Sequence, residues 1–248
     1  MKAMILAAGL GTRLRPLTDD RPKALVEVAG RTLLEITLSR LSALGIRDVI
    51  INVHHFADKI VDYLKAHGNF GMRIEISRED VLLDTGGGLK TAGWFFLEDS
   101  VAADEPFILH NVDVLSTIDL RHMVRVHLEK KALATLAAQQ RGSSRLLLFD
   151  ENLRLCGRRA GRDLEPEIVC PAANLRPLAF CGVHVISPRF LRMMQEDGVF
   201  SIIDSYLRLA ARGESIVGFP ADEYYWRDVG KLEQVQQAAE DYKQRLFS

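Results

Sequence analysis

The sequence predicts an α/β protein whose first 115 residues build a doubly wound, parallel sheet. Apolar blocks of strand length alternate there with segments whose apolar residues recur at helical spacing. The strand blocks are apolar throughout, which is typical of strands that helices cover on both faces. Glycine-rich or polar segments follow several of these blocks, at the strand ends where such sheets bind their ligands.

Strands and helices alternate through this half in a regular order. The first strand is an apolar run over residues 3–8 that Gly9 ends. The first helix, over 32–44, carries leucines at helical spacing and stops at Gly45. The same reasoning predicts strands over 48–53, 72–76 and 106–109 and helices over 57–67 and 88–97. The glycine loop, the glycine triplet and the segment HNVDV should therefore converge on one crevice.

The second half of the chain is less regular. A hairpin is expected over RLLLFDENLRLCG, with its turn at residues 150–152, and an irregular connection over 157–177. Strands are expected over 132–139, 178–186 and 215–219, and helices from Ser187-Pro188, over 201–212 and over 231–246. The sequence has no repeat and no low-complexity linker, so we expect one domain over 1–248 with a substrate-binding second half.

The composition excludes several classes of protein. The net charge is −1, so no global field draws the chain to nucleic acid or membrane, and local cations and amides must hold any bound anion. Cys156, Cys170 and Cys181 are too few and too far apart for a disulfide framework or a CxxC metal site. No stretch approaches the roughly 18 apolar residues of a membrane span, and the apolar start is too short for a signal peptide. We expect a cytoplasmic monomer or homodimer without nucleic-acid or membrane partners.

The stretch GLGTRL, residues 9–14, almost matches a dinucleotide-binding fingerprint. That fingerprint needs glycine at its sixth position, where this chain has Leu14, and Pro16 is poor for the helix that should follow. A P-loop needs a closing Gly-Lys-Ser/Thr, which this loop lacks. A tight turn that needs glycine remains a structural alternative.

The loop fits a polyphosphate better than a dinucleotide. Its backbone N–H groups, with Arg13, Arg15 and Lys23 nearby, form the kind of nest that binds phosphate oxygens. Arg13 and Arg15 are two residues apart and should point to opposite sides of an extended loop. We expect Arg13 to face the ligand and Arg15 to pair with the protein.

The segments LAAGLGTRLRPLT and RPKALVEVAG together resemble the signature of sugar-1-phosphate nucleotidylyltransferases. The resemblance covers residues 3–30 almost without gaps and extends more loosely through TGGG, HNVDV and WRDVG. It implies a Rossmann-like nucleotidyltransferase fold, a mixed, mostly parallel sheet flanked by helices. It also implies a nucleotide-binding half over 1–115 and a sugar-phosphate-binding half over 116–248. The implied reaction transfers a nucleotidyl group from an NTP to a sugar 1-phosphate and releases pyrophosphate.

Two aspartates stand where this chemistry needs a metal. Asp113 ends an apolar strand in HNVDV, and Asp228 precedes the C-terminal helix in WRDVG. Two carboxylates, phosphate oxygens and waters commonly hold Mg²⁺, and the resemblance implies that these aspartates do so. A strand-end turn residue and a helix-cap residue are the structural alternatives. Val112 departs from the family pattern of a small residue before the first aspartate, and either crowds the sugar pocket or changes its shape.

The resemblance also assigns the remaining site residues. Arg13 resembles the arginine that steadies the leaving pyrophosphate, and Lys23 the lysine that contacts the phosphates of both substrates. With Asp113 and Asp228 they form the expected catalytic set. The expected nucleotide-binding residues are Ala7, Ala8, Gly9, Gly11, Thr12, Arg13, Gly86 and Gly87. The expected sugar-phosphate-binding residues are Lys23, Asn111 and Gly182.

Three further features are considered for ligand binding. Glu79 or Asp80 is another candidate beside the nucleobase. Trp226 is expected to be a core aromatic rather than a base-stacking residue. The arginine-rich stretch 154–162 lacks the interleaved aromatics of a nucleic-acid site, so we expect a solvated loop over the sugar pocket.

The compact chain and its TGGG segment look most like the uridylyltransferases that act on N-acetylmuramate 1-phosphate. Mannose- and heptose-1-phosphate guanylyltransferases are the first alternative. A cytidylyltransferase for choline phosphate and a non-catalytic sensor of NDP-sugars also stay open, whereas the loop spacing disfavours a dehydrogenase. We expect Mg²⁺ as the cofactor, and an NTP and a sugar 1-phosphate as the ligands.

Overall fold

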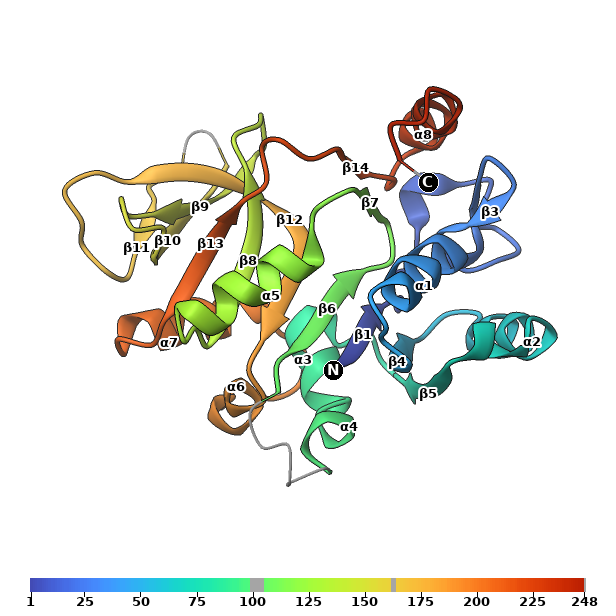
Figure 1. The fold of residues 1–248 in the computed structure, drawn as a ribbon, viewed down its shortest axis with the longest axis horizontal. Helices are drawn as coiled ribbons and strands as arrows, with labels where there is room; N and C mark the ends of the chain where they lie inside the picture. The colour runs from blue at the N-terminus through green and yellow to red at the C-terminus, as the bar shows by residue number, and fades with distance from the viewer. Residues whose placement is uncertain (99–104, 162–163, 248) are drawn as a thin grey trace.

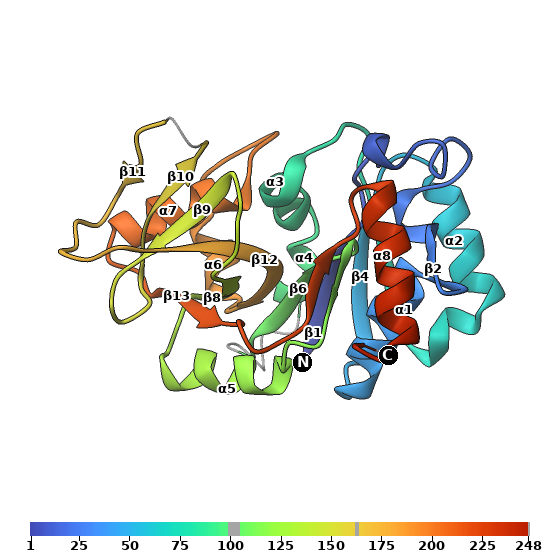
Figure 2. The ribbon, with the colours of Figure 1, turned by 90° about the horizontal axis from the view of Figure 1, so that it is seen from above.

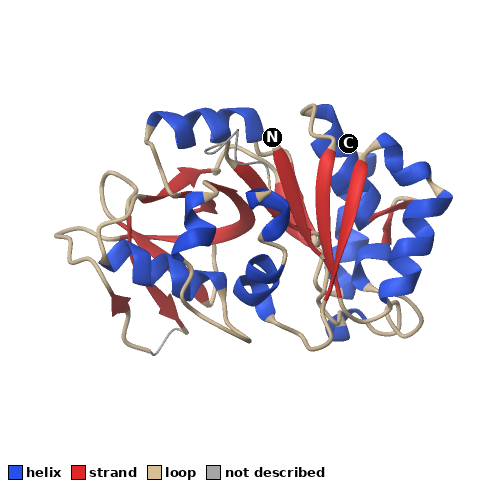
Figure 3. Ribbon diagram, turned by 90° about the horizontal axis from the view of Figure 1, so that it is seen from below, coloured by secondary structure: helices blue, strands red, loops and turns tan. Residues whose placement is uncertain are grey.

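The computed structural model describes residues 1–98, 105–161 and 164–247. A ten-stranded mixed sheet runs through both halves of the chain, and helices lie on either side of it (Figures 1 and 3). The predicted α/β class, with a mixed sheet flanked by helices, is confirmed.

The first half of the chain is a parallel unit. Its strands are β1 (Lys2–Leu6), β4 (Asp48–Val53), β5 (Arg73–Arg78) and β6 (Phe107–Asn111). Its helices are α1 (Leu33–Ala43), α2 (Ala57–Ala66), α3 (Asp84–Thr91) and α4 (Trp94–Leu97). β1 lies between β4 and β6 and is parallel to both, and β5 is parallel to β4. α1 begins after Thr32, whose Oγ1 accepts a hydrogen bond from the Glu35 N–H at 3.0 Å.

The second half adds mostly antiparallel strands. They are β8 (Ala134–Gln139), β9 (Arg145–Phe149), β10 (Leu155–Ala160), β11 (Glu167–Ile168), β12 (Arg176–Ile186) and β13 (Ile216–Pro220). Its helices are α5 (Leu120–Glu129), α6 (Arg189–Met193), α7 (Ile202–Ala211) and α8 (Leu232–Lys243). β12 pairs with β6, β8 and β9 and so joins the two halves. Its register shifts between Phe180 and His184, around Gly182.

The complete sheet has the order β11-β10-β9-β12-β6-β1-β4-β5, with β8 paired to β12 and β13 to β8. Two small antiparallel pairs lie outside it: β2 (Glu27–Val28) with β3 (Arg31–Thr32), and β7 (Val114–Ser116) with β14 (Trp226–Asp228). The short 3-10 helices are η1 (Thr12–Leu14), η2 (Lys23–Leu25) and η3 (Gly68–Gly71). The β7–β14 pair holds the segment before α8 against the segment that follows β6.

Local structure differs from the prediction in several places. The glycine triplet lies inside α3 rather than before it, because tertiary packing overrides the poor helix propensity of glycine. The segment expected to be irregular contains the end of β10 and the strand β11 that pairs with it. The strands β2, β3, β7 and β14 were not predicted, since strands of two or three residues carry no readable period. Helix α5 was missed although its buried residues recur at helical spacing.

Two apolar cores lie on opposite faces of the sheet. One includes residues of α1, α2 and α8, and the other includes residues of α3, α4, α6 and α7 (Figure 2). Ala3 and Ile5 of β1 belong to the first core and Met4 to the second, as the two-residue period of a strand requires. In the described part of the chain, no helix is long and apolar enough to cross a membrane.

Candidate active site

The loop after β1 contains a turn that requires glycine. Gly11 has a φ of +66°, and a Cβ there would lie 3.0 Å from Thr18 Cγ2 and 3.2 Å from Lys23 Cβ. Thr18 Oγ1 also donates a hydrogen bond to the Gly11 carbonyl at 2.9 Å. Gly11 therefore lets the loop pack against the segment that carries Lys23. Gly9, in contrast, has open space around the position of a Cβ.

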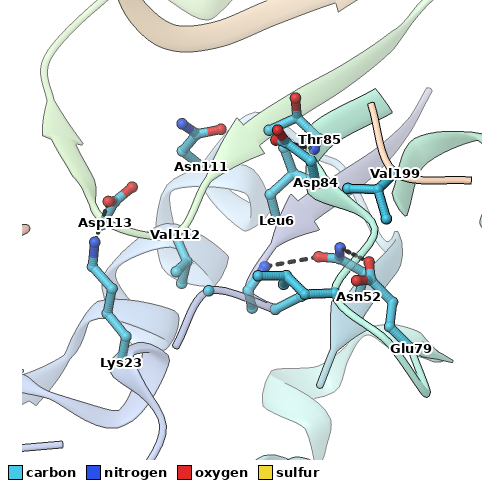
Figure 4. Close-up of a pocket in the computed structure, with 14 residues that line it drawn as sticks. Leu6, Lys23, Asn52, Glu79, Asp84, Thr85, Asn111, Val112, Asp113 and Val199 are labelled. Atoms are coloured by element: carbon cyan, nitrogen blue, oxygen red, sulfur yellow. Dashed lines mark hydrogen bonds and ion pairs between the residues drawn. The ribbon is translucent and has the colours of Figure 1, made fainter. Parts of the chain in front are cut away.

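A cavity of about 350 Å³ opens beside this loop, at the carboxyl ends of β1, β4 and β6 (Figure 4). Its walls include Ala8, Gly9, Thr85, Asn111, Val112 and Val199. The loop and the segment HNVDV thus meet at one crevice, as the sequence predicts, whereas the glycine triplet expected there does not line it. The size and the apolar walls suit a nucleoside.

Two buried polar residues in the wall of this cavity hold each other in place. Asn52 Nδ2 donates to Glu79 Oε1 at 2.6 Å, and Asn52 Oδ1 accepts from the Ala7 N–H at 2.8 Å. Glu79 Oε2 accepts from the Leu83 N–H at 3.0 Å. This network ties β1 and β4 to the segment after β5 (Figure 4). Sequence reasoning missed Asn52, although a polar residue inside the apolar block DVIINV was a visible signal.

Gly86 and Gly87 pack against the chain before α7 and do not line this cavity. A Cβ on Gly86 would overlap the Phe200 ring, and one on Gly87 would overlap the Gly198 carbonyl oxygen. Their N–H groups approach the Phe200 carbonyl oxygen, at 3.0 Å for Gly86 and 3.4 Å for Gly87. The expected contact of these two glycines with a nucleobase is therefore not supported, and Thr85 lines the cavity in their place.

The β7–β14 pair brings the two predicted aspartates together. Asp228 is the register partner of Val114, the residue after Asp113. The Val229 N–H donates to the Asp113 carbonyl at 2.8 Å. A short antiparallel ladder thus places a carboxylate from the end of the chain beside one from the end of β6.

The acidic pair is partly shielded from water and closely surrounded by cations. Burial, and next the charge of Asp113, raise the pKa of the Asp228 carboxyl, while Lys23 and Arg13 oppose the rise. Lys23 Nζ donates a hydrogen bond to Asp113 Oδ2, and the two side chains are 11% and 20% exposed. Asp228 Oδ1 is buried and has no hydrogen-bond partner among the described residues.

These features fit a divalent cation. A cation between Asp113 and Asp228 would relieve their mutual repulsion and give the orphaned Asp228 oxygen a partner. The described residues contain no cluster of three or more His, Cys, Asp or Glu, so two carboxylates are what this site offers. Mg²⁺ is held in this way in nucleotide sites, where one or two carboxylates, substrate phosphates and water complete the shell.

The two loop arginines take different positions. Arg15 Nε lies 3.4 Å from a carboxylate oxygen of Asp19. The Arg13 guanidinium instead lies with Asp228 beside Gly230, where a Cβ would be 2.9 Å from Arg13 Nη2 and 2.7 Å from Asp228 Oδ1. Thr12 is exposed and, like Arg13, does not line the first cavity, so the structure separates these two residues from Ala8 and Gly9.

A second cavity, of about 710 Å³, adjoins the first at Thr85 and Asn111. The Asn111 side chain stands at this border, and its Oδ1 is buried with no partner in the described part of the chain. Gly182 leaves it room, because a Cβ on Gly182 would lie 2.9 Å from Asn111 Nδ2. Asn111 and Gly182, two of the three predicted sugar-side residues, therefore lie next to each other, whereas the third, Lys23, lines the first cavity. Val112 lines the first cavity and not the second, so the expectation that it shapes the sugar pocket is not supported.

The arginine-rich stretch forms a wall of this second cavity. Residues 155–160 are strand β10, not the expected loop. Arg158 Nε donates to Glu167 at 2.7 Å, and its Nη1 donates to Asp204. Arg158 is therefore held by ion pairs within the protein, in the wall of the larger cavity.

Comparison with known proteins agrees with this geometry. Residues 2–145 match the family described as Nucleotidyl transferase. The N-acetylmuramate α-1-phosphate uridylyltransferase of Caulobacter vibrioides is 37% identical over 235 residues, which are 92% of this chain and 91% of that protein. The mannose-1-phosphate guanyltransferase of Yarrowia lipolytica is 28% identical over 235 residues, 93% of this chain and 61% of that protein. The crystal structure of HddC from Yersinia pseudotuberculosis complexed with GMP-PN has a TM-score of 0.74 at 22% identity, covering 97% of this chain and 99% of that one.

Asp113 lies in the wall of the nucleoside-sized cavity with Asp228 beside it, and a larger cavity adjoins the first at Asn111. Such an arrangement on a mixed α/β sheet suits nucleotidyl transfer. The family match covers more than half of the chain, and the Caulobacter relative is similar over nearly its whole length. The chain belongs to the nucleotidyl transferase family, as one of its sugar-1-phosphate nucleotidyltransferases.

Proposed function

We propose that this chain transfers UMP from UTP to N-acetylmuramate α-1-phosphate in a Mg²⁺-dependent reaction that also yields pyrophosphate. The observation that carries the choice of substrates is the 37% identity to the Caulobacter vibrioides uridylyltransferase over nearly the full length of both chains. The adjoining cavities on either side of Asn111 support the order of the ligands, with the nucleoside in the smaller cavity and the sugar in the larger one.

The reaction needs no general base. An oxygen of the sugar phosphate attacks the α-phosphorus of the NTP, and the bond from that phosphorus to the pyrophosphate oxygen breaks. A phosphate monoester has a second pKa of about 6, so the nucleophile is already ionised near neutral pH. His184, which lines the larger cavity, is a very weak base, since burial lowers its pKa to about 3. Catalysis therefore rests on positioning and on neutralising charge.

Asp113 and Asp228 are the residues that would hold Mg²⁺. When bound, the ion would supply charge stabilisation at the transferring phosphoryl group and orient the phosphates. Lys23 keeps Asp113 in place through their ion pair. The remaining N–H donors of its ammonium group are available to phosphate oxygens of either substrate.

Guanylyl transfer is the second candidate, and Glu79 favours it. The Glu79 carboxylate lies in the wall of the nucleoside cavity and carries only acceptor atoms when ionised. Guanine offers an adjacent N1–H and N2–H₂ to such a group, whereas uracil offers one N–H. The similarity to the Yarrowia lipolytica mannose-1-phosphate guanyltransferase supports the same alternative.

The test is pyrophosphate release by the purified chain with Mg²⁺. UTP, GTP, CTP, dTTP and ATP are each crossed with N-acetylmuramate, mannose, heptose, glucose and N-acetylglucosamine 1-phosphates. Release with UTP and N-acetylmuramate 1-phosphate alone supports the proposal, and release with GTP and a neutral sugar supports the second candidate. NTP binding without release for any pair would instead favour a non-catalytic sensor of NDP-sugars.

A further inference from the structure

A third cavity, of about 420 Å³, lies beside Asp228 and shares no lining residue with the other two. Its wall holds four cationic side chains and one acidic one. They are Arg13, Arg141, Arg227, Lys231 and Asp228. The positive charge that this cavity offers a ligand depends on which of these side chains are paired within the protein.

Arg227 is neutralised within the protein. Its Nε donates to Asp241 Oδ2 at 2.7 Å, and its Nη1 donates to Gln234 Oε1 at 2.7 Å. The side chain of Asp241 is only 5% exposed, so this ion pair is well shielded. Arg227 therefore fastens β14 to α8 and adds little positive charge to the cavity.

Arg141 is held by uncharged groups. Its Nη2 donates to the Phe180 carbonyl at 2.8 Å, and its guanidinium lies 3.7 Å from the centre of the Trp226 ring. Trp226 is fixed in turn, because its Nε1 donates to the Cys181 carbonyl at 2.8 Å. Burial lowers the pKa of the Arg141 guanidinium, and Cys181 and Asp228 oppose the fall, but a guanidinium starts from 12.5 and stays protonated near neutral pH. A rigid guanidinium thus keeps its charge at the edge of the cavity, where Asp228 is also placed.

The start of α8 adds to this positive field. Lys231 is exposed and directly precedes the helix, and Gly230 and Gln234 line the same cavity. The N-terminus of a helix of twelve residues carries the positive end of its dipole. Lys231, Arg141 and Arg13 therefore surround one volume next to Asp228.

We propose that this cavity is an oxyanion subsite for phosphate groups of the substrates, in which Arg141 and Lys231 bind phosphate oxygens together with Arg13. The inference rests on the proposed function. The resemblance already implies the contact of Arg13, and the contacts of Arg141 and Lys231 are the new assignment. The β- and γ-phosphates of the NTP are the favoured source. The nucleoside occupies the first cavity and the sugar occupies the cavity that adjoins it, so a triphosphate that passes the acidic pair enters the third one.

The experiment uses Trp226 as an internal reporter. Trp94→Phe removes the other tryptophan, and inorganic pyrophosphate with Mg²⁺ is titrated against the fluorescence of the remaining one. Arg141→Gln and Lys231→Gln are compared with Arg121→Gln, an exposed arginine of α5 outside all three cavities. Because a hydrogen bond between charged groups is worth about 10- to 100-fold in affinity, each test variant should raise the Kd for pyrophosphate by about that factor. Steady-state KM values for the NTP should rise in parallel, with the KM for the sugar 1-phosphate within about twofold of wild type.

The outcomes distinguish the NTP from the sugar 1-phosphate as the source of the bound phosphate, and the subsite from the proposed function. A raised KM for the sugar 1-phosphate with unchanged pyrophosphate binding would keep the oxyanion subsite but assign it to the sugar. Two results together would overturn the subsite: Lys231→Gln leaves binding and kinetics unchanged, and Arg141→Gln loses thermal stability alone. If the subsite is correct, Arg141→Lys should recover part of the pyrophosphate binding that Arg141→Gln loses. The titration needs no turnover, so a chain that binds pyrophosphate through Arg141 but transfers no nucleotide would contradict only the proposed function.

Discussion

Replacing Gly182 by alanine tests how the fold positions Asn111 between the two substrate cavities. Gly182 has a φ of +72°, and a Cβ there would lie 2.8 Å from Val114 Cγ2 and 2.9 Å from Asn111 Nδ2. The left-handed backbone costs an L-residue about 1–2 kcal/mol. Overpacking a filled site adds about 1–3 kcal/mol, so the free energy of unfolding should fall by about 2–5 kcal/mol.

Gly213→Ala is the matched control for the backbone term. Gly213 has a φ of +85° and nothing within 4 Å of the position of a Cβ, so its replacement adds strain without overlap. At about 2–4 °C per kcal/mol for a chain of this size, Gly213→Ala should lower the Tm by about 2–8 °C and Gly182→Ala by about 4–20 °C. The difference between the two variants isolates the overlap with Asn111 and Val114.

The functional readout is steady-state kinetics beside the melting curves. Displacement of Asn111 shifts a residue that borders both cavities and lies two positions before Asp113. Since a misplacement of about 1 Å can reduce the rate about 100-fold, kcat/KM for the sugar 1-phosphate should fall at least about 10-fold in Gly182→Ala and stay at the wild-type value in Gly213→Ala. Equal Tm values and equal kinetics in the two variants would refute the reasoning.

Four further perturbations test the site. Burial raises the pKa of Asp228, so its ionised form destabilises the fold at pH values above that pKa. Asp228→Asn should therefore abolish turnover, while its Tm at pH 7 should equal or exceed that of the wild type. Calorimetry should find no increase in Tm below pH 3.8, the ordinary pKa of the group, because the wild-type carboxyl is then protonated. Lys23→Ala should raise the KM for the sugar 1-phosphate at least about 10-fold, because it removes a cation from the phosphates and leaves Asp113 unpaired; unchanged kinetics would take Lys23 out of the site. Glu79→Gln should change the ratio of kcat/KM between UTP and GTP, and a constant ratio would show that Glu79 does not contact the base. EDTA should stop turnover and Mg²⁺ restore it, whereas turnover without metal would contradict the assignment of Asp113 and Asp228 as ligands.

The sequence alone was sufficient for the architecture of the first half and for the chemistry of the phosphates. The strands of a parallel sheet are buried on both faces, so they consist of consecutive apolar residues, as in DVIINV. Such blocks can be identified from the sequence without knowledge of distant contacts. Lys23, Asp113 and Asp228 could be named because their segments resemble the family signature and because phosphate transfer uses few residue types. The structure places these three side chains together.

Other features required the tertiary structure. Gly86 and Gly87 belong to a glycine-rich segment, and only the tertiary structure shows that they pack against Phe200 and Gly198. In the sequence, Asn52 is a single polar residue in an apolar strand. The structure shows that it hydrogen-bonds to Glu79 and lies in the wall of the first cavity.

The sequence by itself determined the charged residues predicted for the phosphates, because neutralising phosphate charge needs particular residue types and the segments around these residues have local patterns. Only the tertiary structure decided which of them meet. The β7–β14 ladder that joins Asp113 to Asp228, and the stacking of Arg141 on Trp226, link residues far apart along the chain through elements of a few residues. Such contacts leave no periodic signal, because they are selected by the packing of the whole sheet and not by their neighbours in sequence.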